Sequence, residues 1–216
     1  MINVLFLGAP GSGKGTQSEN IIRDYGVIQI STGDILRKAV KDGSALGKEA
    51  KNYMTQGLLV PDSLIVGVMS ERLKGGDAKN GFILDGFPRT VVQAEALDEM
   101  LEKDLKYRLT HVISLEVPDE LIYERITGRR SCPACGRVYH LKFNPPREAG
   151  ICNFDGEKLI CRDDDTEAAL SKRLKVFHES TAIIKPLYEK RGIVLSLDGA
   201  AEPSDVYSKI KAFLDS

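Results

Sequence analysis

The sequence has no long hydrophobic run and almost no net charge. No stretch of its 216 residues reaches about 18 consecutive apolar residues, so we expect no membrane-spanning helix and no membrane partner. Lysine and arginine number 30 against 31 aspartate and glutamate residues, which argues against a general basic face for nucleic acid. The N-terminus also lacks a charged segment followed by an apolar stretch and a cleavage site, which predicts a cytoplasmic protein.

Cysteine is scarce, and all four cysteines lie in one segment between positions 132 and 161. In a reducing compartment such clustering favours metal binding over disulfides. Cys132 and Cys135 are separated by two residues, and Cys152 and Asp155 repeat that spacing. Two such pairs can close a tetrahedral zinc site, and four protein ligands would make the zinc structural. Cys161 is the alternative fourth ligand, and four inert thiols in a loop are the alternative without a metal.

The most informative motif present is a glycine-rich segment at positions 8–16, GAPGSGKGT. It follows the apolar run Ile2–Leu7 and precedes a helical stretch, which is the order that a phosphate-binding loop requires. Glycines let the backbone approach phosphates closely, and Lys14 can reach their oxygens as a mobile charge. The general pattern has serine or threonine directly after the lysine, whereas Gly15 stands here and Thr16 follows. A glycine-rich turn with a solvated lysine is the simpler alternative.

Apolar runs alternate with helical stretches along most of the chain. Buried strands are predicted at Ile2–Leu7, Val27–Ile30, Phe82–Leu84, Val112–Val117 and Ile193–Leu197. Helices are predicted at Gly15–Asp24, Asp62–Leu73, Thr90–Leu105, Asp119–Gly128, Thr166–Lys190 and from Glu202 to Leu214. This alternation predicts an α/β fold in which a parallel sheet carries helices on both faces.

Two segments interrupt the alternation. Residues 31–60 contain two helical stretches, Asp34–Lys41 and Leu46–Gln56, where one helix would suffice. Residues 129–165 are rich in glycine, proline and cysteine, and about 37 residues bury too little apolar surface to fold without help such as a metal. We therefore expect a core domain made of residues 1–30, 61–128 and 166–216, with two inserted domains.

Charged residues gather around the expected phosphate loop. Asp85 follows a predicted strand, where its carboxylate can orient Mg²⁺, with a helix N-cap as the alternative role. Ser31 opens a capping-type motif before a helix that carries Arg37. Further arginines flank the second insertion, namely Arg125, Arg129, Arg130, Arg162 and Arg173. Guanidinium groups in such number suit a reaction that moves a phosphoryl group between two polyanions.

Several short motifs form a specific combination. They are GAPGSGKGT at 8–16, STGD at 31–34, DGFPRT at 85–90, GRR at 128–130, VYH at 138–140, FNPP at 143–146, and Arg162 with Asp164 and Asp165, followed by Arg173. Over essentially the whole chain, this combination resembles the adenylate kinase family in its long-lid bacterial form with a zinc-binding lid. The resemblance implies a P-loop NTPase-like fold with a five-stranded parallel sheet, a small helical AMP-binding domain at 31–60 and a zinc-containing lid domain at 129–165.

The resemblance also implies roles for individual residues. The expected ATP-binding residues are Gly11, Ser12, Gly13, Lys14, Gly15, Thr16, Arg129, Val138, Tyr139 and Ala201. The expected AMP-binding residues are Thr32, Arg37, Leu58, Leu59, Val60, Gly86, Phe87, Pro88, Arg89, Gln93, Arg162 and Arg173. The expected catalytic residues are Lys14, Asp85, Arg89, Arg125, Arg129, Arg162 and Arg173. The expected metal ligands are Cys132, Cys135, Cys152 and Asp155.

The implied activity is reversible, Mg²⁺-dependent transfer of a phosphoryl group from ATP to AMP, giving two ADP, in line and under a closing lid. The nucleophile is a phosphate oxygen that is already ionised, so catalysis needs alignment and electrostatic stabilisation but no strong base. We therefore expect the three histidines to be structural or exposed, namely His111, His140 and His178.

Three alternative functions remain at this point. A kinase for another nucleoside monophosphate is one, although the amide of Gln93 can hydrogen-bond the Watson–Crick edge of adenine. A nucleic-acid-binding module is another, and the near-neutral charge without an aromatic and basic stripe argues against it. An inactive nucleotide sensor is the third, but Lys14, Arg89 and Arg173 are all present. We expect a monomer.

Overall fold

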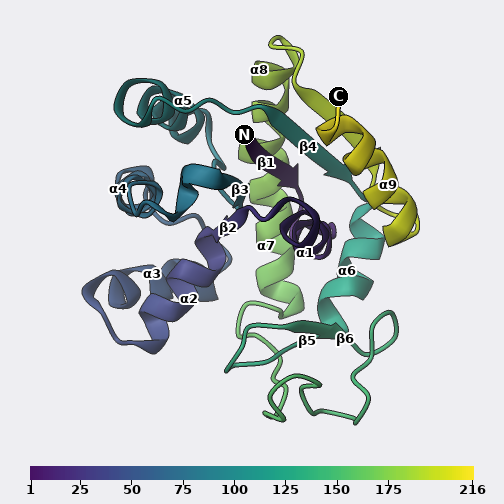
Figure 1. The fold of residues 1–216 in the computed structure, drawn as a ribbon. Helices are drawn as coiled ribbons and strands as arrows, with labels where there is room; N and C mark the ends of the chain where they lie inside the picture. Colours follow the sequence, from purple (N-terminus) through teal and green to yellow (C-terminus); the bar gives the residue numbers. More distant parts are fainter.

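A five-stranded parallel sheet forms the centre of the molecule, which the computed structural model describes over residues 1–216 (Figure 1). The strand order is β2-β3-β1-β4-β7, and every neighbouring pair is parallel. The strands are β1 (Ile2–Gly8), β2 (Ile28–Ser31), β3 (Gly81–Asp85), β4 (His111–Glu116) and β7 (Val194–Asp198). The predicted fold class is therefore confirmed, and each predicted strand lies within two residues of an observed one.

Helices surround this sheet, and none of them is long and apolar enough to cross a membrane. They are α1 (Lys14–Tyr25), α2 (Thr32–Lys41), α3 (Ala45–Thr55), α4 (Asp62–Leu73), α5 (Val91–Glu99), α6 (Asp119–Thr127), α7 (Glu167–Val176), α8 (Lys185–Glu189) and α9 (Pro203–Leu214). Turns of π-helix extend α5 and α7 at Met100–Leu105 and Phe177–Thr181, and 3₁₀ turns lie at Asp77–Asn80 and Ala182–Ile184.

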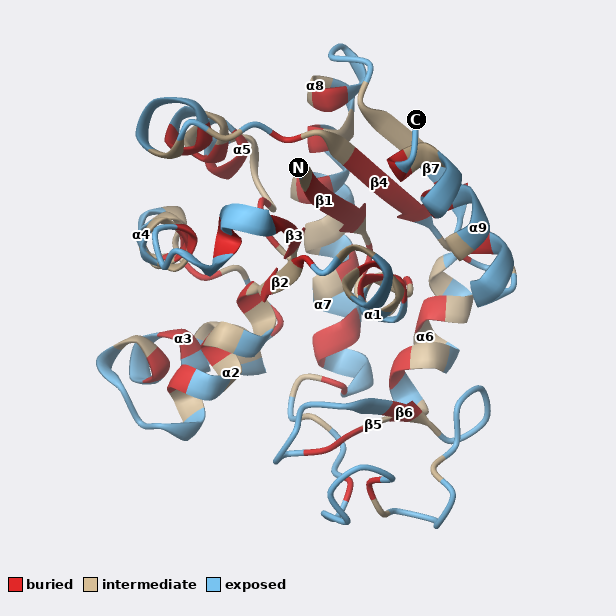
Figure 2. Cartoon of the chain, in the orientation of Figure 1, coloured by how far each residue is buried: buried red, intermediate tan, exposed pale blue.

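Both faces of the sheet are buried, as Figure 2 shows for the central strands. Successive side chains of a strand point to opposite faces, so the alternate residues of β1 enter different cores. Val4 packs in one core with residues of α1 and α9, whereas Leu5 packs in the other with residues of α4, α5 and α8. A strand buried on both faces reads as a continuous apolar run, which is why these strands were predictable.

The sequence predicts one long helix over Thr166–Lys190, and residues 167–189 are helical throughout, but they do not form one continuous α-helix. The structure has α7, a π turn, a 3₁₀ turn and then the short helix α8. Pro186 lies in the first turn of α8. Because proline has no backbone N–H, a continuous α-helix would leave the carbonyl of Ala182 without its partner, and the helix restarts at this point instead.

The two segments that interrupt the alternation fold as separate insertions. In the first, α2 and α3 pack so closely that a Cβ on Gly47 would lie 2.0 Å from the carbonyl oxygen of Ala39. The second contains a two-stranded antiparallel sheet of β5 (Arg129–Ser131) and β6 (Val138–His140), which the sequence did not predict. The insertions touch each other, since Lys41 Nζ donates to the carbonyl oxygen of Pro133 at 3.2 Å.

Candidate active site

The glycine-rich segment is a loop that joins β1 to α1, as predicted. Gly8 has a φ of 145°, and a Cβ there would lie 2.8 Å from the carbonyl oxygen of Leu115. Gly13 precedes α1 with a φ of 103°, and no side chain caps this helix. The first N–H groups of α1 therefore face the loop without a side-chain acceptor, which is the arrangement that binds an anion at a helix N-terminus.

Lys14 lies half-buried at the start of α1, and its amine points back into the loop. Lys14 Nζ donates to the carbonyl oxygens of Gly8 and Ala9, each at 2.9 Å. Burial lowers the pKa of Lys14 to about 8, and the Asp85 carboxylate opposes that change. The guanidinium of Arg89 acts in the same direction as burial, as do two further arginines, Arg173 and Arg129.

These cations form a cluster in which like charges lie close together. Burial, together with charge repulsion from Arg129, lowers the pKa of Arg173 and that of Arg162 to about 10 each. Repulsion from Arg89 also contributes to the lowered pKa of Arg173. Partly desolvated cations that repel one another are held in place by the fold, and a multiply charged anion would relieve this repulsion.

A buried carboxylate, Asp165, and a partly buried one, Asp164, hold part of the cluster in position. The side chain of Asp165 is fully buried and accepts from Arg129 Nε at 2.8 Å. Asp164 forms an ion pair with Arg173 at 2.9 Å, and Asp165 lies 3.6 Å from the same guanidinium. No role was predicted for these acids, although their position shortly after Arg162 was the available signal.

A cavity of about 1040 Å³ opens over the phosphate loop. All the residues expected to bind ATP line it, including Val138 and Tyr139 from β6 and Ala201 beyond β7. All the expected catalytic residues line it as well. The volume is at the upper end of the range that small-molecule sites occupy, so it can hold a ligand as large as a nucleoside triphosphate.

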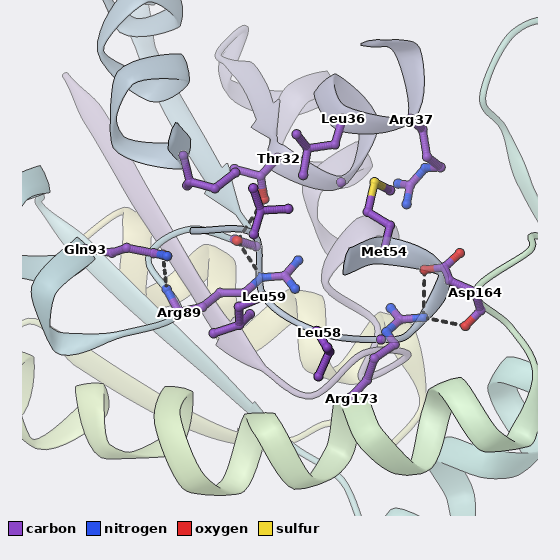
Figure 3. A pocket seen from close by; sticks show the side chains of 15 residues that line it. Thr32, Leu36, Arg37, Met54, Leu58, Leu59, Arg89, Gln93, Asp164 and Arg173 are labelled. Carbon is purple, nitrogen blue, oxygen red and sulfur yellow. Dashed lines mark hydrogen bonds and ion pairs between the residues drawn. The ribbon is translucent and has the colours of Figure 1, made fainter. Parts of the chain in front are cut away.

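A smaller pocket adjoins this cavity (Figure 3). Its lining comes from α2, α3, α4, α5 and α7, from the α3–α4 and β3–α5 connections, and from Asp164. It contains most of the residues expected to bind AMP, namely Thr32, Arg37, Leu58, Leu59, Val60, Gly86, Arg89, Gln93 and Arg173. Pro88 and Arg162 line only the larger cavity, and Phe87 lines neither because its side chain is buried in the core. Apolar lining residues that the sequence missed are Leu36, Met54 and Ile65.

Three arginines line both cavities, namely Arg37, Arg89 and Arg173. Figure 3 shows Arg89 and Gln93 on one side of the smaller pocket, with Arg173 and Asp164 on the other. The cationic cluster therefore lies at the junction of two cavities. A junction of this kind suits two phosphate-bearing ligands whose phosphates meet.

Two further candidates have defined contacts. Arg125 donates to the carbonyl oxygens of Ser12 and Gly199, at 3.4 and 2.9 Å, and its expected contact with a transferring phosphoryl group stays a prediction. Asp85 ends β3 and accepts from Gln29 Nε2 at 3.2 Å. Its alternative role as a helix cap is wrong, because Thr90 caps α5.

The cysteine segment brings four potential metal ligands together. The sulfur atoms of Cys132, Cys135 and Cys152 and a carboxylate oxygen of Asp155 all lie within 4.8 Å of one another. The backbone N–H of Cys135 donates to Cys132 Sγ at 3.4 Å, as thiolates in a metal site require. Cys161 is exposed and outside this group, which agrees with the preference for Asp155. Three thiols and one carboxylate are a donor set that suits a tetrahedral metal ion.

Two histidines, His111 and His178, have the structural or exposed positions that were expected, whereas His140 also lines the larger cavity. His178 is exposed and lies 3.0 Å from Asp119. His140 packs against Gly128 and contacts the carbonyl oxygen of Glu124 at 3.2 Å. His111 is half-buried with its ring edge against Phe213.

The parallel sheet, the phosphate loop and the shared arginines define a P-loop nucleotide-binding protein with two adjoining ligand sites. The family model for adenylate kinase matches residues 6–193. The chain is 48% identical over 214 residues to the adenylate kinase of Archaeoglobus fulgidus and 47% identical over 213 residues to that of Bacillus subtilis. Each alignment covers 99% of this chain and 98% of the relative.

The chain belongs to the adenylate kinase family. It is accordingly a nucleoside monophosphate kinase, an enzyme that converts ATP and AMP into two ADP. The resemblance inferred from the sequence motifs is therefore confirmed.

Proposed function

We propose that ATP occupies the larger cavity, that AMP occupies the smaller pocket, and that the phosphoryl group passes between them at the arginine cluster. The observation that carries this assignment is that Arg37, Arg89 and Arg173 line both cavities beside Lys14. The phosphates of both nucleotides would then share one set of cations. In this arrangement the two substrates meet without any covalent intermediate on the protein.

In this mechanism the chain supplies position and charge. The loop backbone and Lys14 hold the β- and γ-phosphates of ATP, and Arg89 orients the AMP phosphate as the nucleophile. Arg129 and Arg173, which Asp165 and Asp164 hold in position, stabilise the charge on the equatorial oxygens of the transferring group. Alignment of the reacting oxygens supplies much of the remaining rate enhancement.

Asp85 is the residue that we assign to magnesium. Its carboxylate lies at the end of β3, close enough to Lys14 to raise the pKa of that lysine, and a carboxylate oxygen is a hard donor that suits Mg²⁺. When bound, Mg²⁺ neutralises charge on the β- and γ-phosphate oxygens. Asp85 would hold the ion, directly or through its waters, in the larger cavity that it lines.

We further assign residues 31–60 to a domain that binds AMP and residues 129–165 to a lid that closes over both nucleotides. Closure would exclude water, which otherwise competes with AMP for the γ-phosphoryl group. The contact between Lys41 and Pro133 supports such closure, because it shows that the two insertions can reach each other. The assignment needs no second copy of the chain, so we propose a monomer, and the cytoplasmic location stays a prediction from the sequence.

A coupled assay for ADP tests the function directly. We expect ADP from ATP and AMP only when Mg²⁺ is present, and little product with CMP, UMP or GMP as acceptors. A bisubstrate mimic that tethers two adenosines through phosphates should bind far more tightly than either nucleotide, because it fills both cavities at once. If the mimic bound no better than ATP alone, the two-cavity assignment would be wrong.

We assign zinc to the cysteine cluster, where it would fix the lid and take no part in the chemistry. Metal analysis should find one zinc per chain, and Cys135→Ser should remove it. Removal should lower the melting temperature by about 5 °C, because metal binding by a small unit contributes to its folding. Asp155→Ala should also weaken zinc retention against a chelator.

The cysteine outside the cluster, Cys161, provides the matched control. Cys161→Ser should retain zinc and the melting temperature, because its sulfur lies outside the cluster. Zinc loss in Cys161→Ser with retention in Asp155→Ala would reverse the choice of fourth ligand.

A further inference from the structure

The side-chain amide of Gln93 is held from two directions at the edge of the smaller pocket. Its oxygen accepts the backbone N–H of Arg89 at 2.8 Å. Its nitrogen donates to one carboxylate oxygen of Asp62 at 2.7 Å, and the other carboxylate oxygen accepts from the hydroxyl of Thr90 at 3.2 Å. Gln93 is only 2% exposed, so water does not compete freely for these bonds.

These partners permit only one orientation of the amide. A backbone N–H can only donate, and a carboxylate can only accept. Turning the amide of Gln93 by half a rotation would place its nitrogen against the Arg89 N–H and its oxygen against the Asp62 carboxylate. Both contacts would then be repulsive, whereas both are now satisfied.

The fixed amide still has hydrogen-bonding capacity for a ligand. Its oxygen has a second lone pair and its nitrogen a second N–H. An amide in this state can accept from the 6-amino group of adenine and donate to the bare ring nitrogen N1. Hypoxanthine presents the reverse pattern, a carbonyl oxygen and an N1–H, and would need the amide in the turned orientation.

We propose that Asp62 is a positioning residue that sets the base preference of the smaller pocket. By accepting from Gln93 Nε2, it locks the amide in the state that fits 6-amino purines and opposes 6-oxo purines. The inference rests on the proposed function, because it requires the base of the acceptor nucleotide to reach Gln93. A site with a fixed, buried hydrogen-bonding group discriminates strongly against a ligand that cannot match it.

Asp62 also lies in the first turn of α4, where a carboxylate stabilises the helix dipole. A merely structural role would therefore be a sufficient explanation, and the test has to separate the two. The chain contains a matched control in α6, which also begins with a Pro-Asp pair, Pro118 and Asp119. The Asp119 carboxylate contacts His178, which lines neither cavity, whereas Asp62 contacts Gln93 of the smaller pocket.

The test compares kcat/KM for AMP with kcat/KM for inosine monophosphate, with ATP as donor. Asp62→Asn should lower the AMP preference about tenfold, because a neutral amide can donate as well as accept and loses the charge-assisted bond. Asp119→Asn should leave the preference unchanged. Should Asp62→Asn fold poorly, Asp62→Ala removes the acceptor without adding a donor and should shift the preference in the same direction.

A second pair of variants isolates the role of Gln93. Gln93→Met should abolish most of the preference, and adding Asp62→Asn to it should change the preference no further. If Asp62→Asn and Asp62→Ala lowered kcat/KM equally for both acceptors, the positioning role would be overturned and the proposed function would survive. If the wild-type protein failed to phosphorylate AMP, both the proposed function and the positioning role of Asp62 would be wrong.

Discussion

Replacing Lys14 with methionine should lower kcat/KM for ATP by about 10²–10³-fold, the range found when one preorganised donor to a reacting anion is removed. Lys14 carries the only side-chain amine of the phosphate loop itself. Its Nζ donates to the carbonyl oxygens of Gly8 and Ala9 and lies in the lining of the larger cavity, where it can reach a bound phosphate chain. Methionine has a similar length without the charge, so the loop should keep its shape. Steady-state kinetics and a thermal melt would measure both effects.

The control for this substitution is Lys103→Met, since Lys103 is exposed and pairs only with Glu99 on the surface. Its kcat/KM should equal that of the wild type. A Lys14→Met protein with kcat/KM within about threefold of the wild type would show that the amine does not serve the reaction.

The lowered pKa of Lys14 gives the same prediction a dependence on pH. In the free protein the amine is charged below a pKa of about 8 and neutral above it. Because kcat/KM reports the free enzyme, its value for ATP should fall as the pH rises through 8. Lys14→Arg keeps its charge in this range, so its kcat/KM should stay level there, and a level wild-type profile would contradict the assignment.

The stability of the protein should change with pH in the opposite sense. A group whose pKa is lower in the folded than in the unfolded state destabilises the fold while it is protonated in both states. The contribution of Lys14 to the free energy of unfolding is therefore unfavourable below pH 8 and recovers as the pH rises from 8 towards 10.5. The activity that depends on charged Lys14 is therefore highest below pH 8, whereas the contribution of Lys14 to stability improves above pH 8.

The sheet was predictable because its strands are buried on both faces. Phe82–Leu84, for example, is a short apolar run, and the observed strand β3 extends it by one residue at each end. The π and 3₁₀ turns between α7 and α8 were not foreseen, because the apolar positions continue through them and only Pro186 marks the restart of the α-helix. The strands β5 and β6 were missed because three residues are too few to show a two-residue period.

The candidate site was also predictable only in part from the sequence. The phosphate loop and the arginines lie in contiguous motifs, so their identities could be predicted from the sequence. Asp62 and Gln93 meet across 31 positions of the chain, and neither belongs to a local pattern that would indicate the pair. The carboxylates that hold Arg129 and Arg173 were also missed. A run of acidic residues is typical of a solvated loop, and only the structure shows that Asp165 is buried.

Arg173→Ala should lower kcat by about 10³-fold, which is the lower end of the effect of an arginine that stabilises a transferring phosphoryl group. Arg173 lines both cavities, and burial together with charge repulsion from Arg129 lowers its pKa to about 10. A cation held against such repulsion favours whatever anion relieves it. Charge accumulates most on the transferring group in the transition state, so kcat should fall more than the KM for either nucleotide rises.

Arg173→Lys separates the charge of this residue from its geometry. Lysine keeps the positive charge but not the planar fork that contacts two oxygens at once, so it should recover only part of the lost kcat. The substitution also retains a cation next to Asp164, which otherwise would stay buried without its partner at 2.9 Å. Equal melting temperatures for the lysine variant and the wild type would therefore assign its lower kcat to the chemistry rather than to the fold.

Arg191→Lys provides the matched control for that comparison. Arg191 pairs with Asp98 and stacks over the ring of Tyr188, and it lines neither cavity. Its replacement exchanges the same two side chains away from the nucleotides, so kcat should be unchanged. A similar loss of kcat in both lysine variants would mean that Arg173 acts only through the stability of the fold. The shared phosphate site would then have to be assigned to Arg37 and Arg89, which also line both cavities.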